Sequence, residues 1–139
     1  MTEIVTYLNF DGNAREAMTF YAKCLGAELQ LMPFSEMPGN HPPEAKDRIM
    51  HARISKGTNG STALMASDTM PGMAFHPGNN FSVSVQCESM EEIDRIFAAL
   101  SEGGKISMPL ADQFWGARFG MLTDKFGVHW MLNFPHPKP

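Results

Sequence analysis

Residues 7–29 read YLNFDGNAREAMTFYAKCLGAEL, and this stretch decides the first half of the fold. An alternating pattern places Ile4, Leu8 and Phe10 on one face of a strand predicted over residues 4–10. Asp11-Gly12 then interrupts the strand, as a turn does. A helix follows, and a second strand is expected over residues 27–34.

The helix is indicated by its two ends and by the spacing of its apolar residues. Asn13 can cap its N-terminus, and Glu16 follows three residues later, as in a capping box. Gly26 supplies a C-terminal stop. The apolar stripe between these ends consists of Ala17, Met18, Tyr21, Ala22 and Leu25.

The same order of elements recurs in the second half of the chain. Residues 80–86 predict a strand, Ser89 and Glu92 repeat the capping box, and Gly103-Gly104 end a helix before a strand over 105–110. Each half then predicts a hairpin, over residues 48–68 and 118–134, because turn-forming residues occupy both tips. This internal repeat predicts two βαβββ modules.

Neither module can bury both faces of its sheet alone, so we expect a single α+β domain over residues 1–139 with a curled mixed sheet and an open cup. The first module is expected over about 3–68, a linker over 69–78, and the second module over about 79–135. Residues 35–46 are predicted to form a flap or an exposed connection. The linker carries Met70, Met73 and Phe75, and we expect it to pack over a pocket or a partner subunit.

Composition narrows the class of protein. The 11 basic and 15 acidic residues give a net charge of -4 with no run of Lys or Arg, which argues against a nucleic-acid surface. No apolar stretch is long enough to cross a membrane, and the N-terminus lacks the pattern of a signal peptide. Cys24 and Cys87 lie in apolar patterns and are expected to be buried thiols. These features favour a cytoplasmic location.

Four segments carry a family resemblance: residues 7–29, IMHARISKG (49–57), LMASD (64–68) and FWGARFGMLTDKFGVHWMLN (114–133). They resemble the vicinal oxygen chelate superfamily, which includes glyoxalase I, extradiol dioxygenases and bleomycin-resistance proteins, and above all its PhnB-like branch. The resemblance implies a glyoxalase-like fold and a homodimer. It implies no particular reaction, because the superfamily contains isomerases, dioxygenases, lyases and pure binders.

The resemblance also implies where a divalent metal would lie, on the first and last strands of each module. The corresponding positions hold Thr6 or Tyr7, Met65, Phe81 or Ser82, and Met131. These side chains are poor ligands for a hard or borderline cation, so we expect neither the usual metal site nor a cofactor. Three residues remain candidates for a displaced site: His51, His129 and Asp68.

Strand alternation predicts which side chains line the cup. The more apolar phase of each strand should pack under the helix and leave the mixed phase toward the cavity. In the third strand this phase rule places Met50 in the core and Ser55 on the cavity side. The predicted lining is Tyr7, Asn9, His51, Arg53, Ser82, Ser84, His129, Met131 and Asn133, with Met65 added from the resemblance. An apolar lining with few polar groups suits a small organic ligand.

Several of these residues have a functional and a structural interpretation. His51 is the leading catalytic candidate, because a neutral imidazole can act as a base or a donor, but it can equally be hydrogen-bonded within the sheet. Arg53 can bind an anionic substrate or form a surface ion pair. Gln113 and Trp115 can contact a planar ligand, although Trp115 can also anchor a core or a dimer interface. Asp68 can polarise a cup residue or cap nearby backbone.

Three function classes follow. The first is a protein that binds a small organic ligand in its cup without the usual divalent metal. The second is a glyoxalase-like lyase or isomerase that uses a displaced metal or His51. The third is a structural dimer whose cup is filled by side chains. A methyltransferase is disfavoured, because the strand pattern does not offer a doubly wound parallel sheet.

Overall fold

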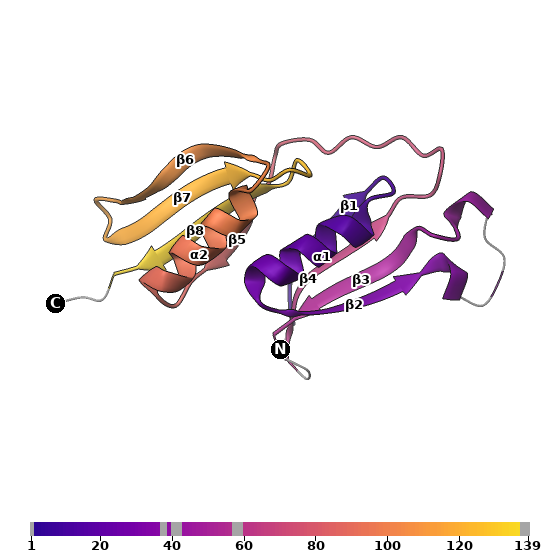
Figure 1. Cartoon of the computed structure of the whole chain (residues 1–139), viewed down its shortest axis with the longest axis horizontal. Coiled ribbons are helices and arrows are strands. Elements are labelled where there is room, and N and C mark those ends of the chain that lie inside the picture. The colour runs from indigo at the N-terminus through magenta and orange to yellow at the C-terminus, as the bar shows by residue number, and fades with distance from the viewer. Residues whose placement is uncertain (1, 37–38, 40–42, 57–59, 137–139) are drawn as a thin grey trace. The chain divides into compact units, whose positions relative to one another are not determined.

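The computed structural model describes residues 2–36, 39, 43–56 and 60–136. Its contacts divide the chain into two compact units, Met1–His76 and Pro77–Pro139. Each unit has one α-helix and one four-stranded mixed sheet (Figure 1). The predicted α+β class with two βαβββ modules is therefore confirmed. No helix among the described residues is long and apolar enough to cross a membrane.

The first unit pairs its strands in the order β1-β4-β3-β2. β1 runs parallel to β4, and the other neighbours are antiparallel. Two short 3-10 turns, Phe34–Glu36 and Pro43–Ala45, lie between β2 and β3. The elements are β1 (Tyr7–Phe10), α1 (Ala14–Leu25), β2 (Glu28–Pro33), β3 (Ile49–Ser55) and β4 (Thr62–Asp68).

The second unit repeats this topology with the order β5-β8-β7-β6. β5 is parallel to β8, while β8, β7 and β6 are antiparallel neighbours. Its elements are β5 (Val83–Gln86), α2 (Met90–Ser101), β6 (Lys105–Asp112), β7 (Ala117–Thr123) and β8 (His129–Pro135). The two sheets thus place β1 and β5, β4 and β8, β3 and β7, and β2 and β6 at equivalent positions.

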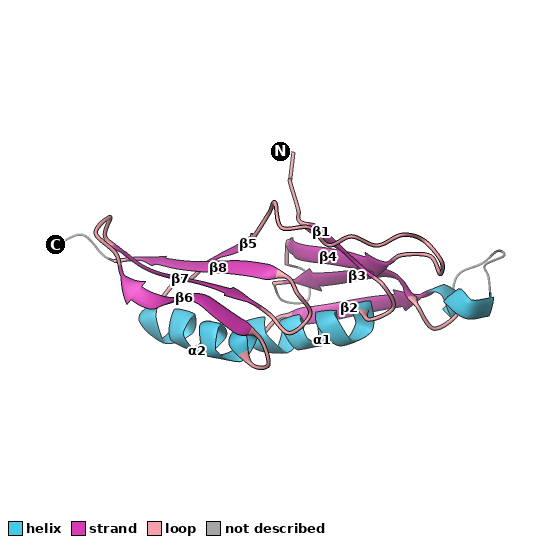
Figure 2. Ribbon diagram, turned by 90° about the horizontal axis from the view of Figure 1, so that it is seen from above, coloured by secondary structure: helices cyan, strands magenta, loops and turns pink. Residues whose placement is uncertain are grey.

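One face of each sheet is covered by the helix of its own unit (Figure 2). In the first unit the covered face is apolar, and Phe10 packs beside Tyr21 of α1 with ring centroids 6.5 Å apart. In the second unit Trp130 and Leu132 are buried on the face that α2 covers. We call the opposite face of each sheet its open face. Because side chains alternate along a strand, the residues between these core positions lie on the open face.

Two strands begin later than the alternating pattern predicts. β1 starts at Tyr7 rather than Ile4, and Ile4 is 98 % exposed. β5 starts at Val83, so Phe81 and Ser82 precede the strand. The alternating pattern nevertheless predicted the buried side of both strands correctly, since Leu8 and Val83 are buried. The strands are shorter because the parallel ladders begin at Tyr7 and Val83.

The face assignment of β3 needs a correction at both ends. Met50 was expected in the core, but Ile49 is buried and Met50 is half-buried. Ser55 was expected on the open face, but it is also buried. Register irregularities lie beside Ile49 and before Ser55, and such bulges reverse the alternation of side chains locally.

The ends of the helices confirm part of the capping prediction. Ser89 Oγ accepts a hydrogen bond from the Glu92 N–H at 3.0 Å, and Gly26 ends α1 in a left-handed conformation with φ 64°. The predicted cap by Asn13 is wrong, because its side chain makes no capping hydrogen bond. Asp68 of β4 takes over part of this role, as described below.

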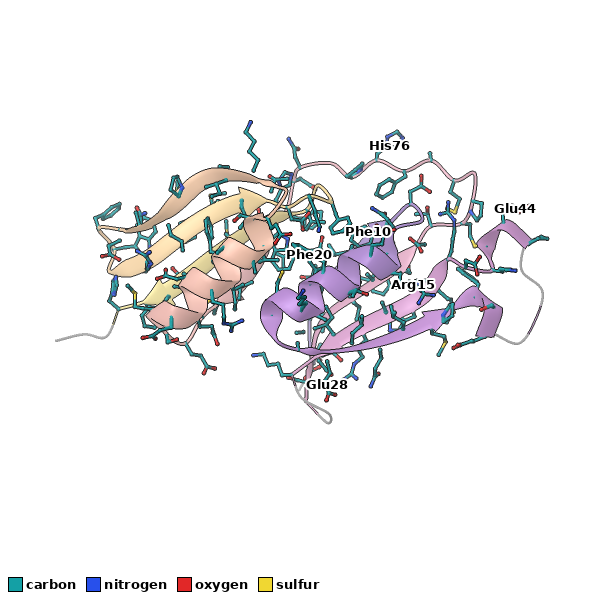
Figure 3. All side chains as sticks on the ribbon, in the orientation of Figure 1. Phe10, Arg15, Phe20, Glu28, Glu44 and His76 are labelled. Atoms are coloured by element: carbon teal, nitrogen blue, oxygen red, sulfur yellow. The ribbon has the colours of Figure 1, made fainter. Side chains whose placement is uncertain are left out.

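Two predicted loops fall partly outside the described residues. The segment 35–46 is described only in part, and residues 57–59 of the first hairpin tip lie outside the described residues. In the linker, Met73 is exposed while Met70 and Phe75 are half-buried. His76 is exposed on the same segment (Figure 3). That this linker covers a pocket or a partner stays a prediction.

Candidate functional site

The open face of the first sheet brings together four of the residues singled out from the sequence. Tyr7 on β1 pairs with Met65 on β4, and Met65 pairs in turn with Arg53 on β3. His51 lies two residues from Arg53 on the same strand. The Tyr7 hydroxyl is 3.4 Å from Nδ1 of His51, and the two ring centroids are 5.9 Å apart. Three polar side chains therefore surround one methionine.

Arg53 is held in place by its own hairpin. Its Nε donates a hydrogen bond to the Thr62 hydroxyl, and one terminal nitrogen donates to the Gly60 carbonyl at 3.2 Å. These contacts fix the direction of a half-buried guanidinium on the open face. Asn9, two residues beyond Tyr7 on β1, is exposed and pairs with Ser67.

Asp68 does not lie on the open face. Its side chain is buried, and one carboxylate oxygen accepts hydrogen bonds from the backbone N–H groups of Gly12 at 2.8 Å and Ala14 at 3.0 Å. The second oxygen accepts from the Ile49 N–H at 2.8 Å. Three backbone donors thus engage this carboxylate. They lie 56, 54 and 19 residues away in the chain, so Asp68 caps distant backbone rather than the nearby backbone expected from the sequence.

The open face of the second sheet carries a row of methionines. Met131 on β8 lies between Ser84 of β5 and Met121 of β7, and Met121 pairs with Met108 of β6. His129, two residues before Met131, pairs with Thr123, and its Nδ1 is 2.8 Å from the threonine hydroxyl. His129 and Met131, both predicted from the sequence, are therefore neighbours on this face.

An amide and hydroxyl network lies beside the methionine row. Gln86 donates from Nε2 to the Ser84 hydroxyl at 3.0 Å, and Asn133 donates from Nδ2 to the Gln86 Oε1 at 3.1 Å. Gln86, Met108, Met121 and Thr123 were not among the predicted site residues. Met121 and Thr123 could have been found from strand alternation, because they flank Leu122, which is buried, and therefore lie on the open face.

Trp115 and Gln113 lie in the turn between β6 and β7. Gln113 closes this turn, because its carbonyl accepts from the Gly116 N–H at 3.1 Å and its own N–H donates to the Ala117 carbonyl at 2.8 Å. Trp115 is 53 % exposed. Its ring contacts Phe114 and Phe119 edge-on, with centroid distances of 5.2 and 5.8 Å. Three aromatic rings in contact, those of Phe114, Trp115 and Phe119, thus extend from the turn to the open face.

The four positions where the superfamily resemblance implies a divalent metal do not fit one. The register pairs Tyr7 with Met65 and Ser84 with Met131, so the fifth-strand position belongs to Ser84 rather than to Phe81 or Ser82. A phenol, a hydroxyl and two thioethers are not the imidazole and carboxylate ligands that such cations prefer. Among the described residues, no three His, Cys, Asp or Glu side chains cluster in a way that could hold a metal ion.

Neither cysteine extends these sites. Cys24 and Cys87 are both buried, and neither forms a disulfide. Burial raises the pKa of Cys87 to about 11, with a smaller contribution from the nearby Glu92 carboxylate. Cys87 is therefore a neutral thiol at physiological pH and a poor nucleophile.

Comparison with known proteins gives a consistent answer on the family. The model of a family described as 3-demethylubiquinone-9 3-methyltransferase matches residues 2–133. Protein YjdN of Escherichia coli is 36 % identical over 145 residues, which cover 96 % of this chain and 95 % of that protein.

Solved structures agree with this match. Protein PA1353 from Pseudomonas aeruginosa superposes with a TM-score of 0.86 at 46 % identity, covering 99 % of this chain and all of that one. A PhnB protein from Bacillus cereus superposes with a TM-score of 0.75 at 34 % identity, covering 96 % and 99 % of the two chains. A glyoxylase/bleomycin resistance protein/dioxygenase domain from Frankia, at 12 % identity, shares the fold, with a TM-score of 0.65 and 100 % and 96 % of the two chains covered.

Proposed function

The chain belongs to the family described as 3-demethylubiquinone-9 3-methyltransferase, the PhnB-like branch of the glyoxalase/bleomycin resistance/dioxygenase superfamily, and we propose that it binds a small organic ligand on the open faces of its sheets. We propose further that it does so without the divalent metal of that superfamily. The observation that carries the proposal is the set of polar groups around Met65 on the first open face, where Arg53 is oriented by Thr62 and Gly60.

The first sheet supplies polar recognition. Tyr7, His51 and Arg53 offer a hydroxyl, an imidazole and a guanidinium around Met65. Arg53 is oriented by Thr62 and Gly60. A ligand that carries a carboxylate or another oxyanion would gain charge-assisted hydrogen bonds from such a group.

The second sheet supplies adaptable apolar contacts. Methionine is flexible and polarizable, so a row of methionines can follow the outline of an apolar ligand. Trp115 can stack on a flat ring at the edge of this face. The first face by itself therefore suits an acidic group, and the second face by itself suits an apolar or aromatic group.

An enzyme is the alternative, and the contact between Tyr7 and His51 favours it. If the Tyr7 hydroxyl donates to Nδ1, the proton of the neutral imidazole lies on Nε2, and His51 can donate a hydrogen bond to a ligand carbonyl. A glyoxalase-like lyase or isomerase could use such a donor, or a displaced metal. Methyl transfer is not proposed, because both sheets of the described chain are mixed and covered by a helix on one face.

The proposal includes the assembly and the location expected from the sequence. We propose a homodimer, on the resemblance to the superfamily, and a cytoplasmic protein with a small-molecule ligand and no nucleic-acid partner. Light scattering coupled to size-exclusion chromatography tests the homodimer, which should have twice the mass of the 15.4 kDa chain.

The binding proposal is tested with 1-naphthoate, which joins a planar ring to a carboxylate. Titration into the ¹⁵N-labelled protein should saturably shift backbone signals of the open-face strands. Arg53→Gln should weaken the binding reported by β1, β3 and β4 of the first sheet, and Trp115→Ala should weaken the binding reported by β6, β7 and β8 of the second. Lys23→Gln, on the exposed side of α1, is the matched control and should have no effect. Shifts spread evenly over the helices, or equal binding by all variants, would contradict the proposal. One divalent ion per chain in elemental analysis would favour the enzyme.

A further inference from the structure

Three methionines on the second sheet lie at directly paired positions of adjacent strands. Met131 pairs with Met121, and Met121 pairs with Met108. Directly opposed residues have Cβ atoms about 4.5–5.5 Å apart, and each methionine has three rotatable bonds. Met121 and Met131 are half-buried, and Met108 is 40 % exposed. Neighbouring thioethers can therefore turn their sulfur atoms toward one point above the sheet.

A nitrogen donor lies at the same place. His129 precedes Met131 by two residues on β8, so both side chains lie on the open face. Its Nδ1 is 2.8 Å from the Thr123 hydroxyl. When Nδ1 carries the proton and donates it to Thr123, the lone pair of Nε2 is left for another partner. A hydrogen bond on one ring nitrogen that orients the other is the usual arrangement of a metal-binding histidine.

The same positions in the first sheet have a different chemistry. Arg53 occupies the position of Met121, since it pairs with Met65 as Met121 pairs with Met131. Gln30 pairs with Arg53 where Met108 pairs with Met121. Because a guanidinium repels a cation, the first sheet cannot offer a cation site at the positions equivalent to Met108, Met121 and Met131. A cation site at these positions is therefore expected on the second sheet only.

From this arrangement we propose that Met108, Met121, Met131 and Nε2 of His129 bind a soft monovalent cation, Cu(I). Thioether and imidazole ligands suit Cu(I), whereas carboxylate and carbonyl oxygens suit Mg²⁺ and Ca²⁺. The second sheet thus carries thioethers where the superfamily resemblance implies imidazole or carboxylate ligands. Thioethers are poor ligands for a divalent ion and good ligands for Cu(I). This inference uses the methionine row that also supplies the apolar contacts proposed above, but its test with a cation alone does not depend on an organic ligand.

The test uses Ag(I), which prefers the same soft ligands as Cu(I) and, unlike Cu(I), is not oxidised by air. The full chain is labelled with ¹³C at the methionine methyl groups and titrated with silver nitrate. We expect the signals of Met121 and Met131, assigned from their Leu variants, to shift and to saturate at one equivalent of Ag(I). The signals of Met32 and Met73 should remain in place.

Affinity in the variants identifies the ligands. The double variant Met121→Leu/Met131→Leu and the single variant His129→Gln should each bind Ag(I) at least about tenfold more weakly, and Thr123→Val should weaken it by about tenfold through loss of the orienting bond. Met32→Leu is the matched control, because Met32 lies exposed on β2, the edge strand equivalent to β6, and it should not change the affinity. Leu conserves the volume of Met, and the remaining methyl signals report whether the fold is intact.

Three outcomes would overturn the proposal. The methyl signals of Met121 and Met131 could fail to shift while Ag(I) binds to Cys24 or Cys87. All methionine signals could shift alike without saturation. The affinity could also be the same in the wild-type protein, the double variant and Met32→Leu, which would leave the methionine row as an apolar surface only.

Discussion

The carboxylate of Asp68, the last residue of β4, accepts a hydrogen bond of 3.0 Å from the backbone N–H of Ala14, the first residue of α1. The same oxygen accepts from Gly12, and the other oxygen accepts from Ile49 at the start of β3. One buried side chain thus joins the end of β4 to the loop before the helix and to the neighbouring strand. A negative charge at this end of the helix also complements its dipole.

We predict that Asp68→Asn lowers the free energy of unfolding by about 1–3 kcal/mol. Asparagine keeps one acceptor oxygen, but its amide group meets at least one of the three backbone donors and leaves that N–H buried without an acceptor. Urea denaturation followed by circular dichroism measures the change.

The control for Asp68→Asn is Asp47→Asn, which removes the same charge from an exposed residue of the same unit. It should change the free energy of unfolding by less than about 0.5 kcal/mol. Equal effects of the two substitutions would show that net charge, rather than the three backbone hydrogen bonds, determines the result.

Gly120 on β7 lies against α2 without room for a side chain. A Cβ atom at this position would be 2.8 Å from Cε2 of Phe97 and 3.1 Å from the backbone nitrogen of Leu110. We predict that Gly120→Ala destabilises the protein by about 1–3 kcal/mol, because an added methyl group overpacks this contact. Thermal unfolding monitored by calorimetry gives the change.

A second substitution tests the cause of this effect. Phe97→Leu removes the ring atom nearest to the added methyl group, so the double variant Phe97→Leu/Gly120→Ala should be more stable than the sum of the two single effects predicts. Simple additivity would indicate that Leu110, whose Cδ2 and backbone nitrogen lie 3.0 and 3.1 Å from the added atom, causes the strain rather than Phe97.

Asp124 organises the turn between β7 and β8 in a similar way. One of its oxygens accepts from the backbone N–H groups of Phe126 and Val128, and the other accepts from the indole N–H of Trp130 at 2.7 Å. We predict that Asp124→Ala costs about 2–5 kcal/mol, because it leaves one buried and two part-buried donors without this acceptor. A double-mutant cycle with Trp130→Phe should give a coupling energy of about 1 kcal/mol or more. A coupling energy near zero would contradict the role of the indole bond.

The sequence allowed most of the fold to be predicted, because its signals were local. The alternation in β8, the Ser89 cap and the Gly26 stop each depend on residues close together in the chain, and all three were confirmed. The cap of α1 was missed because Asp68 lies 54 residues from Ala14 and acts through the fold. No local pattern reports such a contact.

The composition of the open faces could be predicted only in part. Phase along single strands separated the candidates from the core. Met131 lies between buried Trp130 and Leu132, and Tyr7, His51 and His129 each precede a buried residue. That these residues line a ligand site stays a prediction. The sequence could not show that Met121 and Met108 extend the row from Met131, because that depends on the register between strands. Register is fixed by hairpin geometry and bulges, such as the irregularities on either side of Met108.

Cys87 leads to a prediction about both reactivity and pH. Its pKa is raised from 9.0 to about 11, first by burial and then by Glu92, so the folded protein holds the thiol proton more tightly than the unfolded chain does. Well below pH 9 the thiol is protonated in both states and contributes no pH dependence. As the pH rises from 9 toward 11, the unfolded chain loses this proton before the folded protein does, and stability must fall.

Two measurements check this prediction. Iodoacetamide at pH 8 should modify Cys87 in the native protein at least about tenfold more slowly than in urea, because only the thiolate reacts. The loss of unfolding free energy between pH 9 and pH 10.5 should be smaller in Cys87→Ala than in the wild-type protein. Cys24→Ala controls for the removal of a buried thiol. Rapid modification of native Cys87, together with the same pH dependence in Cys87→Ala and the wild-type protein, would show that this thiol is not protected by burial.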